Sequence, residues 1–531
     1  MTYSFFRVKM PLPQDVIQYL VFIVPIIFVL AAACIALLKK SVALTWLISS
    51  TSIWLGLGLT ITACFSAIFM PVKIVGYSSM IFNPTVIRLD ALSLIMLFLI
   101  TIVALVIIIF SKKYLHHEPK ETNYQFWFML TLTSVSVVVT SNHFLIFLCA
   151  WVGISIGLHH LLMFYPNRPR AILAAHKKFL ISRIADICMI TGIVLLYRFH
   201  HTFWISEILQ YYQQARHPLN YHGEVAAIMF AIAALLKCAQ LPLHGWLMQV
   251  MEAPTPVSAL LHAGIINMGG FLMILLSPLM VQSLIAQWLL LLVGGITAVV
   301  ASLVMMTRIS IKVMLAWSTC AQMGFMLVEC GLGLYELALL HLIAHSFYKA
   351  YTFLSSGDAV QQYLQENLAK SRVNPTAMQW VIGCAVSFIA ITSLFLITKS
   401  FVNNLNGFLT IAAIVSIAFG ILLTENLFSH LNVGRVWLMG LTIALFYIAW
   451  HTIFSLIMPK NPLLPNLNGL MSIWVLAIFV TLFIGYIILR FQPQTKHGRR
   501  LYLNLFAGLY LDEWVTRITL KIWPVKLPVS D

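Results

Sequence analysis

The chain has 531 residues, of which 61% are hydrophobic and only 9% are charged, and its mean hydropathy is +0.94. A soluble domain carries about 25% charged residues, so this composition excludes a soluble enzyme and makes lipid the solvent for most of the chain. The formal net charge is +16, which a basic inner face beside anionic lipid explains without any nucleic acid.

About fifteen apolar runs are long enough to cross the hydrocarbon layer as helices. We therefore predict an all-α polytopic membrane protein with about fifteen transmembrane helices. Most Lys and Arg, including Lys177 and Lys178, are assigned to loops on one side, so the positive-inside rule places the N-terminus outside and the C-terminus inside. The runs are 16–38, 43–70, 92–110, 124–140, 143–165, 174–197, 224–250, 256–280, 283–306, 310–330, 335–357, 378–399, 407–428, 433–458 and 468–491.

Several familiar classes of binding site have no signature in the sequence. The eight cysteines are scattered without a C-x-x-C pair, which indicates neither a disulfide framework nor a thiolate metal site. Neither G-x-G-x-x-G nor a P-loop occurs, and the polar stretches are too short for a nucleotide-binding fold. We expect no bound cofactor and no metal, and we expect that the chain is not an enzyme.

Lys237 lies within the apolar stretch AAIMFAIAALLKCAQLPLHGWL. An ammonium group at bilayer depth costs about 2.5–3.5 kcal/mol on insertion scales, so it marks a candidate functional site. Pro242 follows and removes a backbone donor, which breaks the helix just before His244. A desolvated lysine can exchange its proton near neutral pH, which suits a proton relay. The competing interpretation is a side chain that snorkels to the membrane surface.

Arg183 and Asp186 form a second polar cluster inside a predicted span, in the stretch ISRIADI. Their spacing of three residues places them on one helical face. The pair either belongs to an ion path or neutralises itself and only joins helices, and the spacing does not choose between the two.

A third cluster lies in the stretch MEAPTPVSALLHAG. Pro254 and Pro256 are predicted to end one helix and open the next, because proline interrupts a helix interior but suits its first turn. His262 follows about two turns into the new helix. It is either a relay for protons or a hydrogen-bonded core residue.

The fourth cluster is HLIAHSFYKAYTFLSSG, in which His341, His345 and Lys349 follow one another at intervals of four residues. This spacing lines them up on one stripe of a single helix. Three titratable groups in file inside lipid are hard to explain by packing, and imidazole exchanges protons at neutral pH. A paired-His metal site is the alternative, but neither carboxylate nor thiolate stands at ligand spacing on that helix.

Three isolated polar residues fall in the last third of the chain: Lys399, Glu425 and His451. Each belongs either to a second pathway or to a helix end. Lys399 is counted among the candidate ion-path residues because it falls inside a predicted span.

Several stretches together resemble a known family: IRLDALSLIMLFLIT, LKCAQLPLHGWL, MEAPTPVSALLHAG, IKVMLAWSTCAQMGFM and HLIAHSFYKAYTFLSSG. They are similar, in order and spacing, to the antiporter-like membrane subunits of respiratory complex I and of multisubunit cation/proton antiporters. The similarity runs from about residue 80 to 360. It implies two inverted five-helix repeats with a broken helix in each, and proton movement through buried side chains. The matching positions are Lys237, His262, His341, His345 and Lys349.

Departures from the complex I pattern indicate a particular branch of that family. Val152 stands where the complex I subunits carry a fifth-helix Glu, the segment 260–273 differs, and the long lateral helix of the end subunit is not expected. These features resemble the DabB family of bacterial inorganic carbon uptake complexes. The resemblance implies a multi-pass protein of the bacterial inner membrane, driven by protons or sodium ions, and a DabA-like zinc protein as partner. Asp186 is the candidate replacement for the missing Glu.

The resemblance also implies a division of the chain into three parts. Residues 1–110 form the first three transmembrane helices, residues 111–457 form the antiporter-like core, and residues 458–531 form the last span with a basic tail. That tail is expected at the inner membrane surface or on a partner. Two other functions stay open: a subunit of complex I or of a cation/proton antiporter, and a non-conducting membrane anchor.

Overall fold

A computed structural model describes residues 14–39, 41–69, 86–214, 219–359 and 469–525, with a few single residues between 361 and 449. Within these ranges the chain is helical, and β structure is limited to two isolated bridges. Nine helical segments of the described chain are long and apolar enough to cross a membrane. The prediction of an all-α polytopic membrane protein is confirmed.

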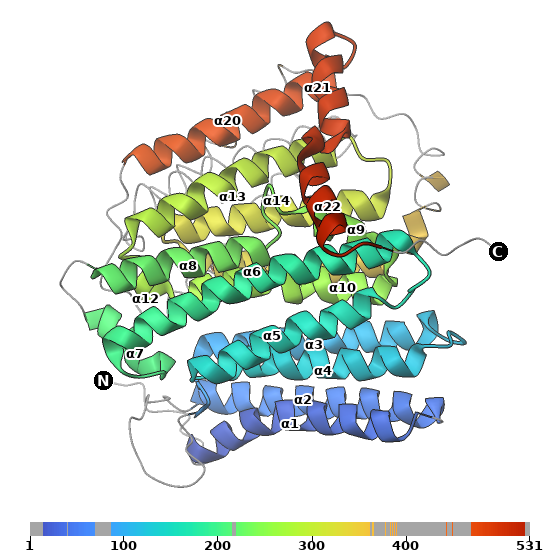
Figure 1. Cartoon of the computed structure of the whole chain (residues 1–531), viewed down its shortest axis with the longest axis vertical. Helices are drawn as coiled ribbons and strands as arrows, with labels where there is room; N and C mark the ends of the chain where they lie inside the picture. The colour runs from blue at the N-terminus through green and yellow to red at the C-terminus, as the bar shows by residue number, and fades with distance from the viewer. Residues whose placement is uncertain are drawn as a thin grey trace. The chain divides into compact units, whose positions relative to one another are not determined.

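The chain divides into two compact units, the first formed by Met1–Leu161 with Phe203–Ser206 and the second by Leu162–Thr202 with Glu207–Asp531. In the first unit, α1 packs against α2 and α4, and α2 packs against α3 (Figure 1). Gly157 lies directly on Thr131 of α4, because small residues let two membrane helices approach closely. The helices of this unit are α1 (Gln14–Leu37), α2 (Val42–Phe69), α3 (Ala91–Tyr114), α4 (Glu121–Thr140) and α5 (Phe144–Leu162).

The second unit contains the broken helices. In this unit α13 packs closely on α14, where Gly294 and Gly324 meet backbone to backbone. α6 packs on α8, and α10 packs on α15. The elements are α6 (Pro169–His200), α7 (Ile205–Gln214), α8 (Tyr221–Lys237), α9 (Gly245–Gln249), η2 (Val250–Glu252), α10 (Thr255–Ala263), η3 (Ile265–Asn267), α11 (Met268–Leu275), α12 (Ser277–Met280), α13 (Leu284–Met305), α14 (Ile311–Gly331), α15 (Tyr335–Leu354), η4 (Ser356–Asp358), α20 (Gly469–Phe491), α21 (Lys496–Phe506), η6 (Gly508–Tyr510) and α22 (Leu511–Ile522).

The predicted spans before residue 360, and the last span, correspond to helices of the structure. The runs 378–399, 407–428 and 433–458 lie almost entirely outside the described residues, so the count of fifteen stays a prediction. One assignment was wrong. Lys177 and Lys178, which the charge pattern placed in an inner loop, lie inside α6 and are buried. The helix begins earlier than predicted because Pro169 occupies its first turn, where proline is favoured.

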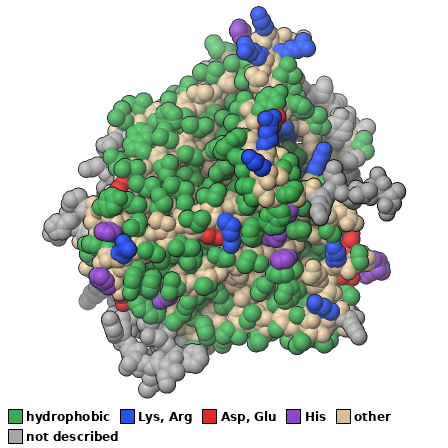
Figure 2. Space-filling view, viewed as in Figure 1, with side chains coloured by type: hydrophobic (Ala, Val, Ile, Leu, Met, Phe, Trp, Pro, Cys, Tyr) green, Lys and Arg blue, Asp and Glu red, His purple; other side chains and the backbone are tan. Residues whose placement is uncertain are grey.

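Much of the molecular surface is apolar, and Figure 2 shows a face made mostly of hydrophobic side chains. Leu30, Leu55 and Ile473 are more than half exposed. Soluble proteins rarely expose contiguous apolar surface of this extent, whereas a lipid-facing surface requires it. Lys and Arg gather instead over α21, at the top of the same view.

Candidate ion-translocation site

The helix breaks where α8 ends, and Lys237 is the last residue of α8. The Ala239 backbone adopts a left-handed conformation with φ of 51°, and the Gln240 N–H donates to the Leu235 carbonyl at 3.1 Å. This is the geometry of a Schellman helix end. Pro242 lies in the turn that follows, and α9 restarts the helix at Gly245. Lys237 therefore lies at the break itself rather than in mid-helix.

Neighbouring helices satisfy the backbone groups that the break leaves without a helical partner. The Leu241 N–H donates to the hydroxyl of Thr297 on α13 at 3.1 Å. The Ala239 carbonyl accepts from the thiol of Cys320 on α14 at 3.1 Å. Non-helical backbone is tolerated at membrane depth only where protein supplies such partners, so α13 and α14 stabilise the break.

Asp186 lies at the level of Lys237. α6 and α8 run antiparallel (Figure 1), and a Cβ added to Gly192 of α6 would lie 2.8 Å from the Phe230 ring of α8. Lys237 lies about two turns after Phe230 on α8, and Asp186 lies about two turns before Gly192 on α6. Because the two helices are antiparallel, both steps lead in the same direction. Both side chains are buried, at 6% and 5% exposure, and they lie within electrostatic range of each other.

Two further charges accompany Asp186 on α6. Arg183 Nη2 lies 2.8 Å from the Asp186 carboxylate. Lys178, Ser182 and Asp186 are all buried and follow one another at intervals of four residues, so they form one stripe. Lys178 also lies within electrostatic range of Lys237. Sequence analysis missed Lys178. The same interval of four was visible in the sequence, within the predicted run 174–197, but Lys178 was assigned to an inner loop.

The second broken segment lies between Glu252 and Met268. Pro254 immediately precedes α10 with an extended backbone, and Pro256 occupies the first turn. α10 ends at Ala263, and after Gly264 the short helix η3 leads into α11. The Asn267 amide donates to the Ala263 carbonyl at 3.1 Å and to the Ser346 hydroxyl of α15 at 2.7 Å. These bonds join the interruption to α15.

The stripe on α15 lies inside the helix bundle. Lys349 is fully buried, and its Nζ donates to the Ser318 hydroxyl at 2.8 Å and to the Leu315 carbonyl at 3.2 Å, both on α14. The His341 and His345 ring centroids are 6.3 Å apart. His345 is buried, and neither of its ring nitrogens has a hydrogen-bond partner among the described residues. Ordered water is the usual partner of such buried nitrogens.

His262 of α10 joins the same cluster. Its Nδ1 lies 3.0 Å from the hydroxyl of Thr319, and its ring stacks on Phe353 with centroids 4.3 Å apart. The side chain is fully buried and lies within electrostatic range of Lys349. The hydrogen bond and the stacked ring explain its packing, and its place next to Lys349 also suits a relay.

Glu329 of α14 is a carboxylate that sequence analysis overlooked. Its Oε2 lies 3.0 Å from Nδ1 of His341, and both side chains are largely buried. The residue was visible as a lone acid in the apolar run 310–330, without any spacing that connected it to a second polar group. In the structure it places a carboxyl group at the start of the α15 stripe.

α14 connects the broken helix with the stripe. Thr319 contacts His262, and its neighbour Cys320 contacts the Ala239 carbonyl at the break. One helix thus touches both polar clusters through adjacent residues. Lys399 lies outside the described residues, as do Glu425 and His451. Across the described part of the chain, His, Cys, Asp and Glu form no group of three or more that could hold a metal ion.

A broken helix, buried lysines and a histidine stripe within an apolar helix bundle define the class of antiporter-like membrane subunits. The family model for the transmembrane part of NADH:quinone oxidoreductase and the Mrp antiporters matches residues 141–424. The model for the N-terminus of complex I chain 5 matches residues 79–125. The fold is similar to a chain in the structure of the Mrp complex from Dietzia sp. DQ12-45-1b, with a TM-score of 0.57 and 19% identity, covering 95% of this chain and 56% of that one.

Curated relatives narrow this class to one branch. The chain is 45% identical to the probable inorganic carbon transporter subunit DabB of Hydrogenovibrio crunogenus, over 82% of this chain and 83% of the relative. It is 36% identical to the probable subunit DabB2 of Halothiobacillus neapolitanus, over 83% and 81%. NADH-quinone oxidoreductase subunit L of Rhodobacter capsulatus is 33% identical over 52% and 41%. The chain belongs to the DabB family of inorganic carbon transporter membrane subunits, as its sequence motifs predicted.

Proposed function

We propose that this chain moves protons or sodium ions across a bacterial inner membrane and thereby drives inorganic carbon uptake by a partner subunit. The observation that carries the proposal is the file of buried titratable groups from Glu329 along α15 to Lys349. Such groups are costly inside a membrane, and ion pathways are their usual purpose. A non-conducting anchor would gain nothing from them.

The geometry suggests how an ion path is built. Asp186 offsets the charge of Lys237 at the break. In the complex I subunits a fifth-helix Glu has this role, and this chain has Val152 at that position. α14 leads from the break to His262, and the α15 stripe continues from Lys349 to His341. Groups four residues apart on a helix are about 6 Å apart, so one bridging water per step can carry a proton between them.

The partner that the family resemblance implies is a DabA-like protein whose zinc site resembles that of β-carbonic anhydrases. This chain has no C-x-x-C pair, and its cysteines are scattered through the spans. The chemistry of carbon dioxide and bicarbonate is therefore assigned to the partner, and the ion movement to this chain.

Expression of this chain alone should fail to restore growth in air to a bacterium that requires high CO₂. Expression together with its DabA-like partner should restore it, because only the pair combines the ion path with a zinc site. Growth curves and uptake of labelled bicarbonate measure the result. Rescue by this chain alone would refute the proposal, and co-purification with respiratory subunits instead of a zinc protein would favour the complex I function.

A Glu329→Gln variant should lower uptake by about tenfold or more. A hydrogen bond to a charged group contributes about 1.5–3 kcal/mol, which corresponds to a factor of about 10 to 100, and the neutral amide loses most of this contribution to the contact with His341. Glu336→Gln is the matched control, because Glu336 is also a partly buried acid of this region but lies in the first turn of α15. Equal uptake in the two variants would show that the Glu329 charge takes no part in transport.

A further inference from the structure

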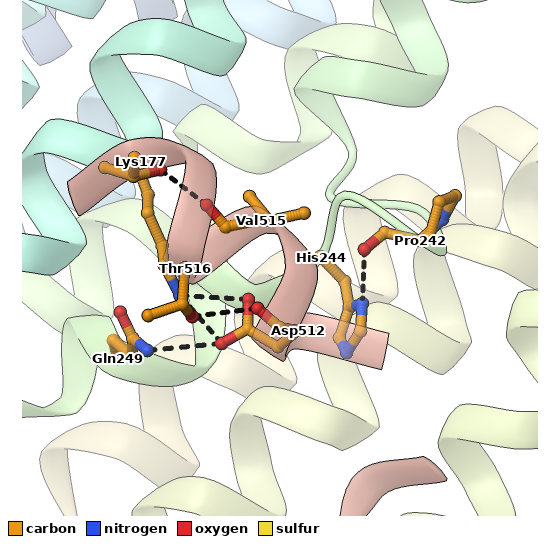
Figure 3. Close-up of polar contacts among 8 residues, drawn as sticks. Lys177, Pro242, His244, Gln249, Asp512, Val515 and Thr516 are labelled. Atoms are coloured by element: carbon orange, nitrogen blue, oxygen red, sulfur yellow. Dashed lines mark hydrogen bonds and ion pairs between the residues drawn. The ribbon is translucent and has the colours of Figure 1, made fainter. Parts of the chain in front are cut away.

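The C-terminal helix α22 lies against α6 and α9, next to the broken helix (Figures 1 and 3). Its residue Asp512 accepts hydrogen bonds from Lys177 Nζ of α6 at 2.8 and 3.0 Å. The same carboxylate accepts from the Gln249 amide of α9 at 3.2 Å. The Asp512 side chain of the tail therefore binds both α6 and α9, the helix that follows the break.

The Lys177–Asp512 ion pair is built into the helix bundle. Lys177 has no exposed side-chain surface, whereas 30% of the Asp512 side chain is exposed. Lys177 Nζ also donates to the Thr516 hydroxyl one turn further along α22 at 2.6 Å. A buried ammonium is tolerated only with a close partner of opposite charge and further hydrogen bonds. Both come here from α22.

Close backbone contact accompanies the ion pair. The Asp512 carboxylate lies directly on Gly245, so that a Cβ at that position would collide with it. Gly245 is the first residue of α9. His244, just before it, is buried, packs on the Trp317 ring, and has its Nδ1 3.3 Å from the Pro242 carbonyl oxygen. Asp512 thus lies against the point where the helix resumes after its break, as Figure 3 shows.

Other contacts hold the tail without reaching the break. The Trp523 ring stacks on His176 of α6, with centroids 3.9 Å apart and planes 9° apart. Arg308, after α13, donates to the Leu505 carbonyl of α21 at 3.2 Å. These contacts would keep α22 in place in variants that lose the Asp512 charge, which makes the role of that charge testable by itself.

We propose that Asp512 is a positioning residue of the ion path. By binding Lys177 and Gln249 at the same time, Asp512 fixes the position of α6 relative to α9, the helix that follows the break. α6 carries Asp186, and the broken helix carries Lys237. The tail therefore fixes the position of the Asp186 carboxyl group relative to the Lys237 amino group. This inference rests on the proposed function. It makes the C-terminal helix part of the transport machinery rather than a surface anchor.

Hydrogen exchange on the purified full-length complex tests the positioning directly. An Asp512→Asn variant should exchange faster than wild type in peptides that cover 243–252 and 509–525, and equally in peptides from α13 and α14. Glu513→Gln is the matched control: Glu513 is the next residue of the same helix, and it pairs with Arg517 on the surface. Unchanged protection of 243–252 in Asp512→Asn would overturn the proposal.

Uptake supplies the second readout, normalised to the complex present in the membrane. Asp512→Asn should lower uptake by about tenfold or more, because small misplacements of reacting groups cost up to about a hundredfold. The double variant Lys177→Gln with Asp512→Asn should recover most of this loss, since no buried charge is left without a partner and the two amides can still bond. Recovery supports positioning by the pair. A double variant that assembles but stays inactive, or that does not accumulate at all, overturns it.

A Lys237→Ala variant measured in parallel separates this inference from the proposed function. If Lys237→Ala is inactive while Asp512→Asn transports normally, the ion path stands and the positioning role of Asp512 falls. If Lys237→Ala transports normally, the part of the proposed function that routes ions past Lys237 fails, whatever the tail variants do. If Asp512→Asn does not accumulate but the double variant does, the unpaired charge of Lys177 is the cause, which supports the pair.

Discussion

Replacing Lys237 with Ala should abolish uptake, by about a hundredfold or more, which is the scale of loss when a positioned proton-transfer group is removed. The protein should still insert and bind its partner. Ala suits a helix end as well as its interior, and Asp186 keeps its ion pair with Arg183 at 2.8 Å. Uptake of labelled bicarbonate, divided by the amount of assembled complex, measures the effect.

Lys237→Arg should fail as well, because a guanidinium group stays protonated and cannot release its proton. Lys113→Ala is a suitable control, since Lys113 is exposed at the end of α3. Normal transport by Lys237→Ala would mean that this lysine only snorkels to the surface and that the relay role is wrong.

A His345→Leu variant should collapse uptake by a similar factor of about a hundred. Leucine would exclude water from the middle of the stripe and leave His341 and Lys349 about 12 Å apart along the helix. Folding should survive, because leucine is apolar and the ring nitrogens of His345 have no hydrogen-bond partner among the described residues that would be lost. Size-exclusion chromatography of the complex checks assembly, and labelled bicarbonate reports transport.

The companion variant His345→Gln distinguishes a proton carrier from a water-binding scaffold. Glutamine keeps hydrogen bonding but does not titrate, so a carrier role predicts that it fails like leucine. Near-normal uptake in the Gln variant would instead show that His345 only organises water. Protonation of the imidazole would then be no part of the mechanism.

The membrane class and the α15 stripe could be predicted from the sequence because both depend on short-range properties. Apolar runs of sufficient length form helices in lipid whatever surrounds them, since every backbone group must be satisfied within the segment. Residues four apart share a helical face by geometry alone. His341, His345 and Lys349 were therefore recognised as one stripe, and the structure places this stripe inside the bundle.

The partners of these groups could not be predicted in the same way. Glu329 and His341 lie on different helices, and only the packing of α14 on α15 brings them to 3.0 Å. Lys178 was missed because a basic residue near the end of a span was assigned to a loop, and only the packing of α6 shows that it is buried. The location of Lys237 at the break, rather than in mid-helix, follows from the Schellman end at Ala239, a residue with no glycine-like signal in the sequence.

The sequence by itself determined the all-α membrane architecture, the family and the titratable groups of the broken helix and the stripe. Each depends on composition, on local spacing or on motifs that are read along the chain. The tertiary structure alone decided which charges meet: Glu329 with His341, and Lys177 with Asp512 across 335 residues of sequence. Helix spacing places a charge on a face, but its partner depends on which helix packs against that face and at what level, and no local pattern encodes that choice.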